Sequence, residues 1–201
     1  MSGLSDFITS RVRVKILDLF FAHPEDMYYI REVTREIGEE INAVRRELNQ
    51  LVDKGMLKTE DRANRSYYFL NRAYPFYSEL QQIVMKERGL ALKIRKNRKK
   101  LGTVEFVMFS SQFINREANK TGNDLDMLVI GEVVLPELEL LVKEEEKELG
   151  REINYTVLDA NEFKFRKQRR DPFIMDIMYG KKIMVIGNED DFVDRTISFS
   201  S

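Results

Sequence analysis

Apolar residues recur with helical spacing through the first part of the chain. Between Ser5 and Pro24 they follow a period near 3.6 residues, and the proline ends the run, so we predict a first helix there. Met27–Tyr29 is a short stretch of residues that favour strands. A second helical run follows it and ends at Gly38. This order predicts a helix, a short strand and a second helix.

A third helical run and a predicted hairpin follow. Ile41–Lys54 carries its apolar residues on one face, and Gly55 ends it. Met56–Thr59 and Ser66–Leu70 are predicted as two strands, with the polar residues 60–65 as the loop between them. The other face of the third helix then has to carry Asn42, Arg45, Arg46 and Asn49.

The region after Pro75 is predicted to be mostly helical. Residues 76–101 suit one long helix, with a break near Gly89. Its end, Lys93–Lys100, contains six basic residues. These form either a contact to DNA backbone phosphates or a solvated helix face, and Gly102 marks a domain boundary.

Beyond Gly102 the pattern alternates between buried strands and helices. The predicted strands are Val104–Phe109, Leu125–Ile130, Ile153–Leu158 and Ile183–Ile186. The predicted helices are Pro136–Gly150, Asn161–Arg170 and Pro172–Tyr179. A mixed sheet with flanking helices follows, and the fold class of the chain is α+β. We expect domains at 1–74 and 103–201, joined by a linking helix at 75–102.

Composition adds limits and a charge difference. The chain has no Cys and no apolar run long enough to span a membrane, so we expect a cytoplasmic protein with no membrane partner. Residues 1–102 carry 20 Lys and Arg against 14 Asp and Glu, whereas residues 103–201 carry 13 against 20. The first half is therefore expected to attract a polyanion.

The first half resembles a winged helix-turn-helix domain over residues 5–72. The segments NAVRRELNQLVDKGML and RSYYFLN are similar to the recognition helix and wing of that family. The resemblance implies that Asn42, Arg45, Arg46 and Asn49 face base edges of double-stranded DNA. Arg62 and Arg65 on the wing would meet phosphate or the minor groove, and Arg31 is a further candidate. Such domains also dock proteins or form dimers, and Glu39, Glu40 and Glu47 would weaken DNA binding.

In the second half, one apolar run ends at Phe109-Ser110-Ser111, and Asp124 and Asp126 open the next. This pattern resembles the minimal nucleotidyltransferases of the DNA polymerase beta superfamily. The resemblance implies that Ser110 and Ser111 bind a nucleoside triphosphate, and that Asp124 and Asp126 are catalytic and hold Mg²⁺. Ser110 stands where that family has glycine, and Asn115 stands where it often has a second one. The loop from Ser111 to Asp124 is about two residues longer than is typical of the family.

The third metal-binding carboxylate of that family is replaced in this sequence. Asn154 occupies its position, and an amide is a neutral ligand and a poor base. Glu152 would share a strand face with Asn154 and is a substitute metal ligand, although it lies about 6–7 Å away along the strand. We therefore expect a nucleotidyltransferase-like domain that has lost catalysis.

These patterns predict a DNA-binding transcriptional regulator whose second domain is inactive or senses a nucleotide. One alternative is an active Mg²⁺-dependent enzyme that transfers a nucleoside monophosphate to a hydroxyl group. Another is a partner-binding protein that resembles antitoxins sharing this fold. Winged-helix regulators are often dimers, so we expect a homodimer on that resemblance.

Overall fold

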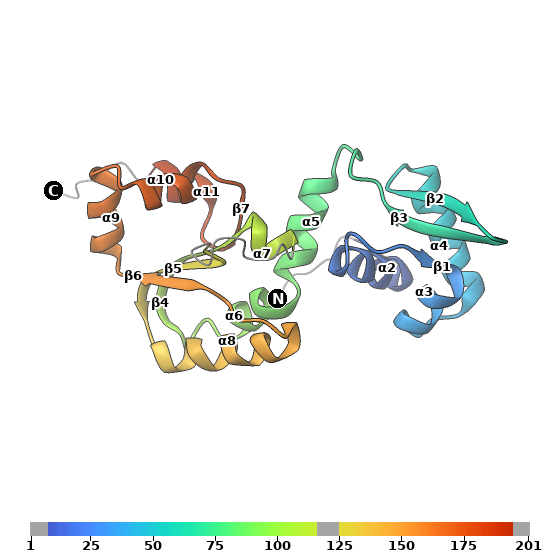
Figure 1. Ribbon diagram of the computed structural model, residues 1–201. Helices are drawn as coiled ribbons and strands as arrows, with labels where there is room; N and C mark the ends of the chain where they lie inside the picture. Colours follow the sequence, from blue (N-terminus) through green and yellow to red (C-terminus); the bar gives the residue numbers. More distant parts are fainter. Residues whose placement is uncertain (1–7, 116–124, 195–201) are drawn as a thin grey trace. The chain divides into compact units, whose positions relative to one another are not determined.

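The computed structural model describes residues 8–115 and 125–194 of the chain. The chain divides into two compact units, Met1–Glu87 and Arg88–Ser201 (Figure 1). Helices and strands alternate in both units, which confirms the α+β fold class. Within the described part of the chain, no helix is both long and apolar enough to cross a membrane.

The first unit is built from helices packed beside a small antiparallel sheet. Its elements are α2 (Arg11–Ala22), β1 (Tyr28–Tyr29), α3 (Ile30–Ile37), α4 (Ile41–Asp53), β2 (Leu57–Arg62), β3 (Arg65–Leu70) and α5 (Tyr77–Lys86). The strands lie in the order β1-β3-β2. A helix, a short strand, a helix, a turn, a helix and a hairpin form the winged helix-turn-helix arrangement that the sequence predicted.

Local sequence explains the turn between α3 and α4. Gly38 ends α3 in the left-handed conformation, with φ of 63°, which glycine adopts at little cost. Val33, Val44 and Leu48 are fully buried in the core between the helices and the sheet. Burial of this one face of α4 fixes which residues the helix exposes.

The hairpin differs from its prediction. Residues 60–65 were expected to form a polar loop, but β2 and β3 extend into them and pair from Leu57↔Leu70 to Arg62↔Arg65. Only Ala63 and Asn64 form the turn, both with positive φ, 43° and 68°. A two-residue turn of this kind matches the twist of the strands, and polar residues are tolerated because β2 is almost entirely exposed.

The region predicted as a linking helix contains two helices. α5 ends at Lys86 in the first unit, and α6 (Gly89–Lys96) begins the second. Residues 1–87 carry 13 basic residues against 14 acidic ones, and residues 88–201 carry 20 of each. The charge difference between the halves thus arises from residues 88–100, and the expectation of a basic winged-helix half does not hold for the unit as a whole.

The second unit contains a mixed sheet with helices on both faces (Figure 1). Its further elements are β4 (Gly102–Ser110), α7 (Ser111–Asn115), β5 (Met127–Val133), α8 (Leu135–Leu149), β6 (Tyr155–Leu158), α9 (Ala160–Gln168), α10 (Pro172–Tyr179), β7 (Lys182–Ile186) and α11 (Glu189–Asp194). The strand order is β6-β5-β4-β7, with β5 parallel to β6 and antiparallel to β4. The predicted strands and helices are confirmed, with ends shifted by a few residues.

Helices α9, α10 and α11 cover one face of this sheet, and α6 and α8 cover the other (Figure 1). Phe106, Met108 and Leu128 pack with Phe163 and Phe192 on the first face. The sheet places the end of β4 next to the start of β5, because Ser110 N–H donates to the Asp126 carbonyl. The predicted Ser110 and Asp126 sites are therefore neighbours.

Candidate nucleic-acid interface

Helix α4 presents the predicted recognition residues to solvent. The Glu40 carboxylate caps its first turn and accepts from the backbone N–H groups of Asn42 and Ala43, at 2.8 and 2.9 Å. These two bonds hold the pKa of Glu40 below its ordinary value. The predicted helix face is exposed and comprises Asn42, Arg45, Arg46 and Asn49.

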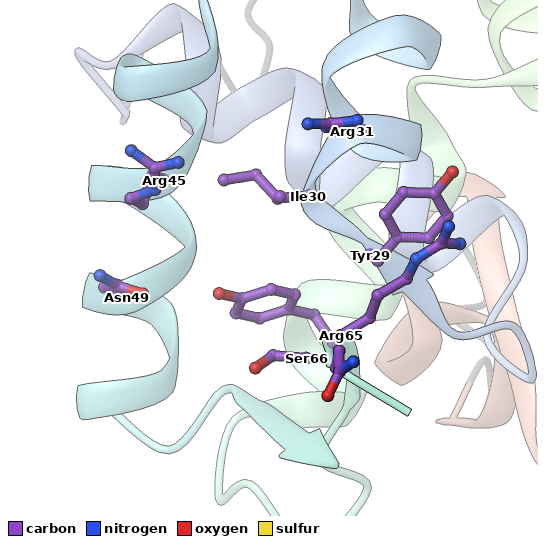
Figure 2. A pocket seen from close by; sticks show the side chains of 9 residues that line it. Tyr29, Ile30, Arg31, Arg45, Asn49, Arg65 and Ser66 are labelled. Atoms are coloured by element: carbon purple, nitrogen blue, oxygen red, sulfur yellow. The ribbon is translucent and has the colours of Figure 1, made fainter. Parts of the chain in front are cut away.

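A groove of about 480 Å³ runs between α4, the start of α3 and the β2–β3 hairpin, which we call the wing (Figure 2). Arg45 and Asn49 line it from α4, and Arg31 lines it from α3. Its other lining residues are Tyr29, Ile30, Asn64, Arg65, Ser66 and Tyr68. The structure thus brings together four of the predicted DNA-binding residues and leaves Asn42, Arg46 and Arg62 outside the groove lining.

The two wing arginines have different partners. The Arg65 guanidinium lies 4.6 Å from the centre of the Tyr29 ring, which in turn packs edge-on against Tyr67. Arg62 instead donates to Glu60 on its own strand, with Nε–Oε1 at 2.7 Å. This bond lowers the pKa of Glu60 and partly neutralises Arg62. Arg65 keeps its charge available at the groove.

The acidic residues around α4 are occupied by basic residues of α2. Glu47 accepts from Arg13 Nε at 2.8 Å and from Ser10 Oγ at 2.6 Å. Glu39 accepts from Lys15 Nζ at 2.6 Å, and this hydrogen bond holds the pKa of Glu39 below its ordinary value. Since these charges are balanced locally, they oppose an anionic ligand less than the sequence suggested.

The groove arginines are not balanced in this way. Within residues 8–115 and 125–194, no carboxylate lies at ion-pair distance from Arg31, Arg45 or Arg65. Arg45 donates to the Asn42 side-chain oxygen at 2.9 Å, a neutral partner on the same helix. Three guanidinium groups therefore surround one groove without a carboxylate at ion-pair distance among the described residues, which suits a polyanion.

Sequence reasoning missed several residues of the groove. Tyr68 is 8% exposed and belongs to the core of the first unit, yet it also lines the groove. Burial raises the pKa of Tyr68, while the nearby Arg45 charge acts in the opposite direction. Tyr29 and Ser66 reach the groove because β1 pairs with β3, Tyr29 opposite Tyr67. A prediction that β1 pairs with β3 would have placed Tyr29 and Ser66 at the groove.

The second predicted site has a different character. Asp126 is 1% exposed, and its carboxylate accepts from Arg151 at 2.9 and 3.3 Å and from the Asn154 backbone N–H at 3.0 Å. Arg151 also lies over the Phe113 ring, 5.4 Å from its centre. A guanidinium thus occupies the coordinating side of Asp126. Asp124 lies outside the described residues.

The remaining predicted ligands do not gather around Asp126 as metal ligands. The backbone of Asn154 pairs with the start of β5, since its carbonyl accepts from Asp126 N–H at 2.8 Å. Glu152 is exposed and precedes β6, which begins at Tyr155, so its expected place on a strand face beside Asn154 is wrong. Among the described residues, no cluster of three acidic or histidine side chains could hold a metal. The predicted magnesium site also includes Asp124, so it stays a prediction.

A cavity of about 280 Å³ lies beside the predicted serines. Ser110 and Ser111 line it together with Asp176, Lys181 and Lys182. The Ser111 backbone N–H donates to the Lys181 carbonyl at 3.0 Å, so this amide is already bonded. The Lys182 ammonium is likewise engaged, by Glu189 at 2.7 Å and the Met178 carbonyl at 2.8 Å. Among the described residues that line the cavity, exposed Lys181 is the cation that remains for an anionic ligand.

Comparisons with known proteins gave limited findings. No protein-family model matches the sequence, and no curated protein matches it. The DNA-binding protein Sso10a-2 from Sulfolobus solfataricus is 21% identical, with a TM-score of 0.32, over 43% of this chain and 84% of its own. A protein from Methanosarcina mazei Go1, described as a possible transcriptional regulator, is 13% identical, with a TM-score of 0.32, over 47% of this chain and 80% of its own.

Proposed function

We propose that this chain is a DNA-binding transcriptional regulator that docks its winged-helix unit on duplex DNA. The observation that carries the proposal is the groove bounded by α4 and the wing, where Arg31, Arg45 and Arg65 stand without a carboxylate partner among the described residues. An α-helix fits the major groove, and phosphate contacts on either side fix its position. The winged-helix unit has both features: helix α4 for the major groove and arginines beside it for the phosphates.

The residue types divide these tasks. Arg45 and Asn49 lie one helical turn apart on α4, so both can reach base edges in one major groove. An arginine pairs bidentately with guanine and an asparagine with adenine. Arg65, held against Tyr29, can then contact phosphate beside the helix. Arg31, near the start of α3, is a second phosphate contact.

The experiment is a binding titration with a labelled mixed-sequence duplex across a range of salt concentrations. Affinity should fall steeply with salt because bound Lys and Arg displace counterions from DNA. Arg45→Ala with Arg46→Ala should weaken binding at least tenfold, whereas Lys164→Ala with Arg169→Ala, an equal loss of charge in the second unit, should not. No binding at low salt, or equal effects of the two pairs, would contradict the proposal.

For the second unit we infer a regulatory role without nucleotidyl transfer. Two observations support it: Asp126 is engaged by Arg151, and Asn154 stands where the resembling family has a carboxylate. The cavity beside Ser110 and Ser111, with Lys181 at its edge, suits an anionic nucleotide as an effector. Mg²⁺ would then enter only with that nucleotide.

Calorimetric titration with Mg²⁺ and a nucleoside triphosphate tests this role, followed by mass analysis of the protein and any acceptor. Heat of binding without transfer supports a sensor. Transfer that disappears in Asp124→Asn and Asp126→Asn would show the active enzyme instead. If neither heat of binding nor transfer is observed and a specific protein co-purifies, the antitoxin-like alternative is favoured.

The predicted homodimer is checked by sedimentation with and without DNA.

A further inference from the structure

A second basic surface lies at the start of the second unit. It consists of the exposed residues Lys96, Arg98, Lys99 and Lys100, which follow one another closely at the end of α6 and in the turn before β4. We name it the basic turn. It contributes most of the positive charge that residues 88–100 add to the chain.

The basic turn is held in a fixed shape. The Asn97 side chain donates to the Lys93 carbonyl at 2.9 Å, and Lys100 N–H donates to the Asn97 carbonyl at 2.8 Å. Ile94 before it and Leu101 after it are 0% and 1% exposed. Because both ends are anchored in the core of the unit, the charges are displayed on an ordered turn.

The structure of the unit does not account for the charges of Arg98, Lys99 and Lys100. Cations stabilise the last turn of a helix, which explains Lys93, Arg95 and Lys96 but not the residues beyond the helix end. Lys93 is engaged in the fold, since it pairs with Glu145 at 3.0 Å and Glu148 at 2.7 Å. In the part of the chain that the structure describes, no carboxylate pairs with the four residues of the basic turn.

We propose that the basic turn binds the phosphate backbone of the same DNA duplex and extends the contact made by the winged-helix unit. This inference rests on the proposed function. Residues 1–87 carry 13 basic and 14 acidic residues, so that unit gains little attraction to DNA beyond its groove arginines. The basic turn begins nine residues after that unit ends, and attachment through one chain raises its effective concentration at the DNA.

The test measures how the affinity of the full chain for a labelled mixed-sequence duplex of about 30 base pairs depends on salt. Each phosphate contact contributes about 0.9 to the slope of log affinity against log salt. The variant Lys96→Gln, Arg98→Gln, Lys99→Gln and Lys100→Gln should lower this slope by about 2–4 and weaken binding at low salt by at least tenfold. Sequence preference should not change, because phosphate contacts carry none.

The matched control removes four exposed cations elsewhere in the same unit, through Lys147→Gln, Lys164→Gln, Arg169→Gln and Arg170→Gln. It should leave the slope within about 1 of the wild type. An unchanged slope in the basic-turn variant, while Arg45→Ala still weakens binding, overturns this inference and leaves the proposed function standing. Equal slope losses in the variant and the control also overturn it. A wild-type chain that fails to bind DNA contradicts the proposed function itself.

Discussion

The groove beside α4 and the buried site at Asp126 both contain arginines, but the arginines have opposite settings. Arg31, Arg45 and Arg65 surround an open groove, and no carboxylate among the described residues balances them. Arg151 is closed onto Asp126, which is 1% exposed and accepts from it at 2.9 Å. Charge in the first region is available to a ligand, whereas charge in the second is used by the fold.

This difference separates a binding surface from a structural ion pair. Like charges that a fold holds close together repel one another and lower its stability. A ligand of opposite charge relieves that repulsion, as is expected at a binding surface. A carboxylate that is buried, paired and bonded to a backbone N–H is satisfied without a ligand. The resemblance to nucleotidyltransferases stays a prediction, and a likeness in fold would not by itself give this site its chemistry.

The largest expected effect is on DNA affinity. Replacing Arg31, Arg45 and Arg65 together by alanine should weaken binding to duplex DNA about 1000-fold at 0.1 M salt. The salt slope should fall by about 2, since Arg31 and Arg65 each lose a phosphate contact that contributes about 0.9. The melting temperature should be nearly unchanged, because these side chains are at the surface. Fluorescence anisotropy and thermal denaturation measure the two quantities. A large loss of stability would place these arginines in the fold.

The converse effect is expected for Arg151. Arg151→Ala leaves the Asp126 carboxylate buried without its cation, which should lower the free energy of unfolding by about 3 kcal/mol. Arg151→Lys, which keeps the charge but not the bidentate geometry, should cost less. Denaturant unfolding measures both. If Arg151→Ala cost under about 1 kcal/mol, the pair would not hold the fold as described.

A smaller effect distinguishes the two wing arginines. Arg65→Ala should weaken DNA binding about tenfold at low salt, since one phosphate contact is lost. Arg62→Ala should change it less than threefold, because Arg62 is paired with Glu60 at 2.7 Å. Glu60→Gln should then release Arg62 and strengthen binding slightly. Equal losses from the two alanine variants would show that the Glu60 pair opens on DNA.

The smallest effect concerns the two tyrosines of β1. Burial, assisted by Asp26, raises the pKa of Tyr28 from 10.0 to about 12. A pKa raised by folding means that the neutral phenol is favoured, so its contribution to stability is present below pH 10 and is lost as pH rises towards 12. Tyr28→Phe should remove that late step from an absorbance titration and leave DNA binding unchanged.

Tyr29→Ala should weaken DNA binding, since the Tyr29 ring supports the Arg65 guanidinium.

Sequence periodicity predicted most of the elements because each buries one apolar face. The exposed face of α4 followed directly, since Val44 and Leu48 had to point inward. The hairpin was misjudged because β2 is exposed along nearly its whole length and gives no apolar alternation. Its polar residues were therefore interpreted as loop.

The site residues that sequence missed depend on contacts between distant segments. Arg151 lies 25 residues from Asp126 along the chain, and no local pattern links them. The Arg65–Tyr29 contact needs the β1–β3 pairing. The Arg62–Glu60 pair is local, but it needs the extended strand that was not predicted there. Total charge over 102 residues concealed that the basic excess follows the winged-helix unit rather than lying within it. The magnesium and nucleotide sites stay predictions.

The most direct test of the contrast between the two regions follows arginine side-chain signals in a nuclear magnetic resonance titration of the full chain with duplex DNA. The Nε–Hε resonances of Arg31, Arg45 and Arg65 should shift and saturate together as DNA is added, while that of Arg151 stays in place. Assignment comes from single Arg→Lys variants. A shift at Arg151 with no change at the three groove arginines would contradict the account.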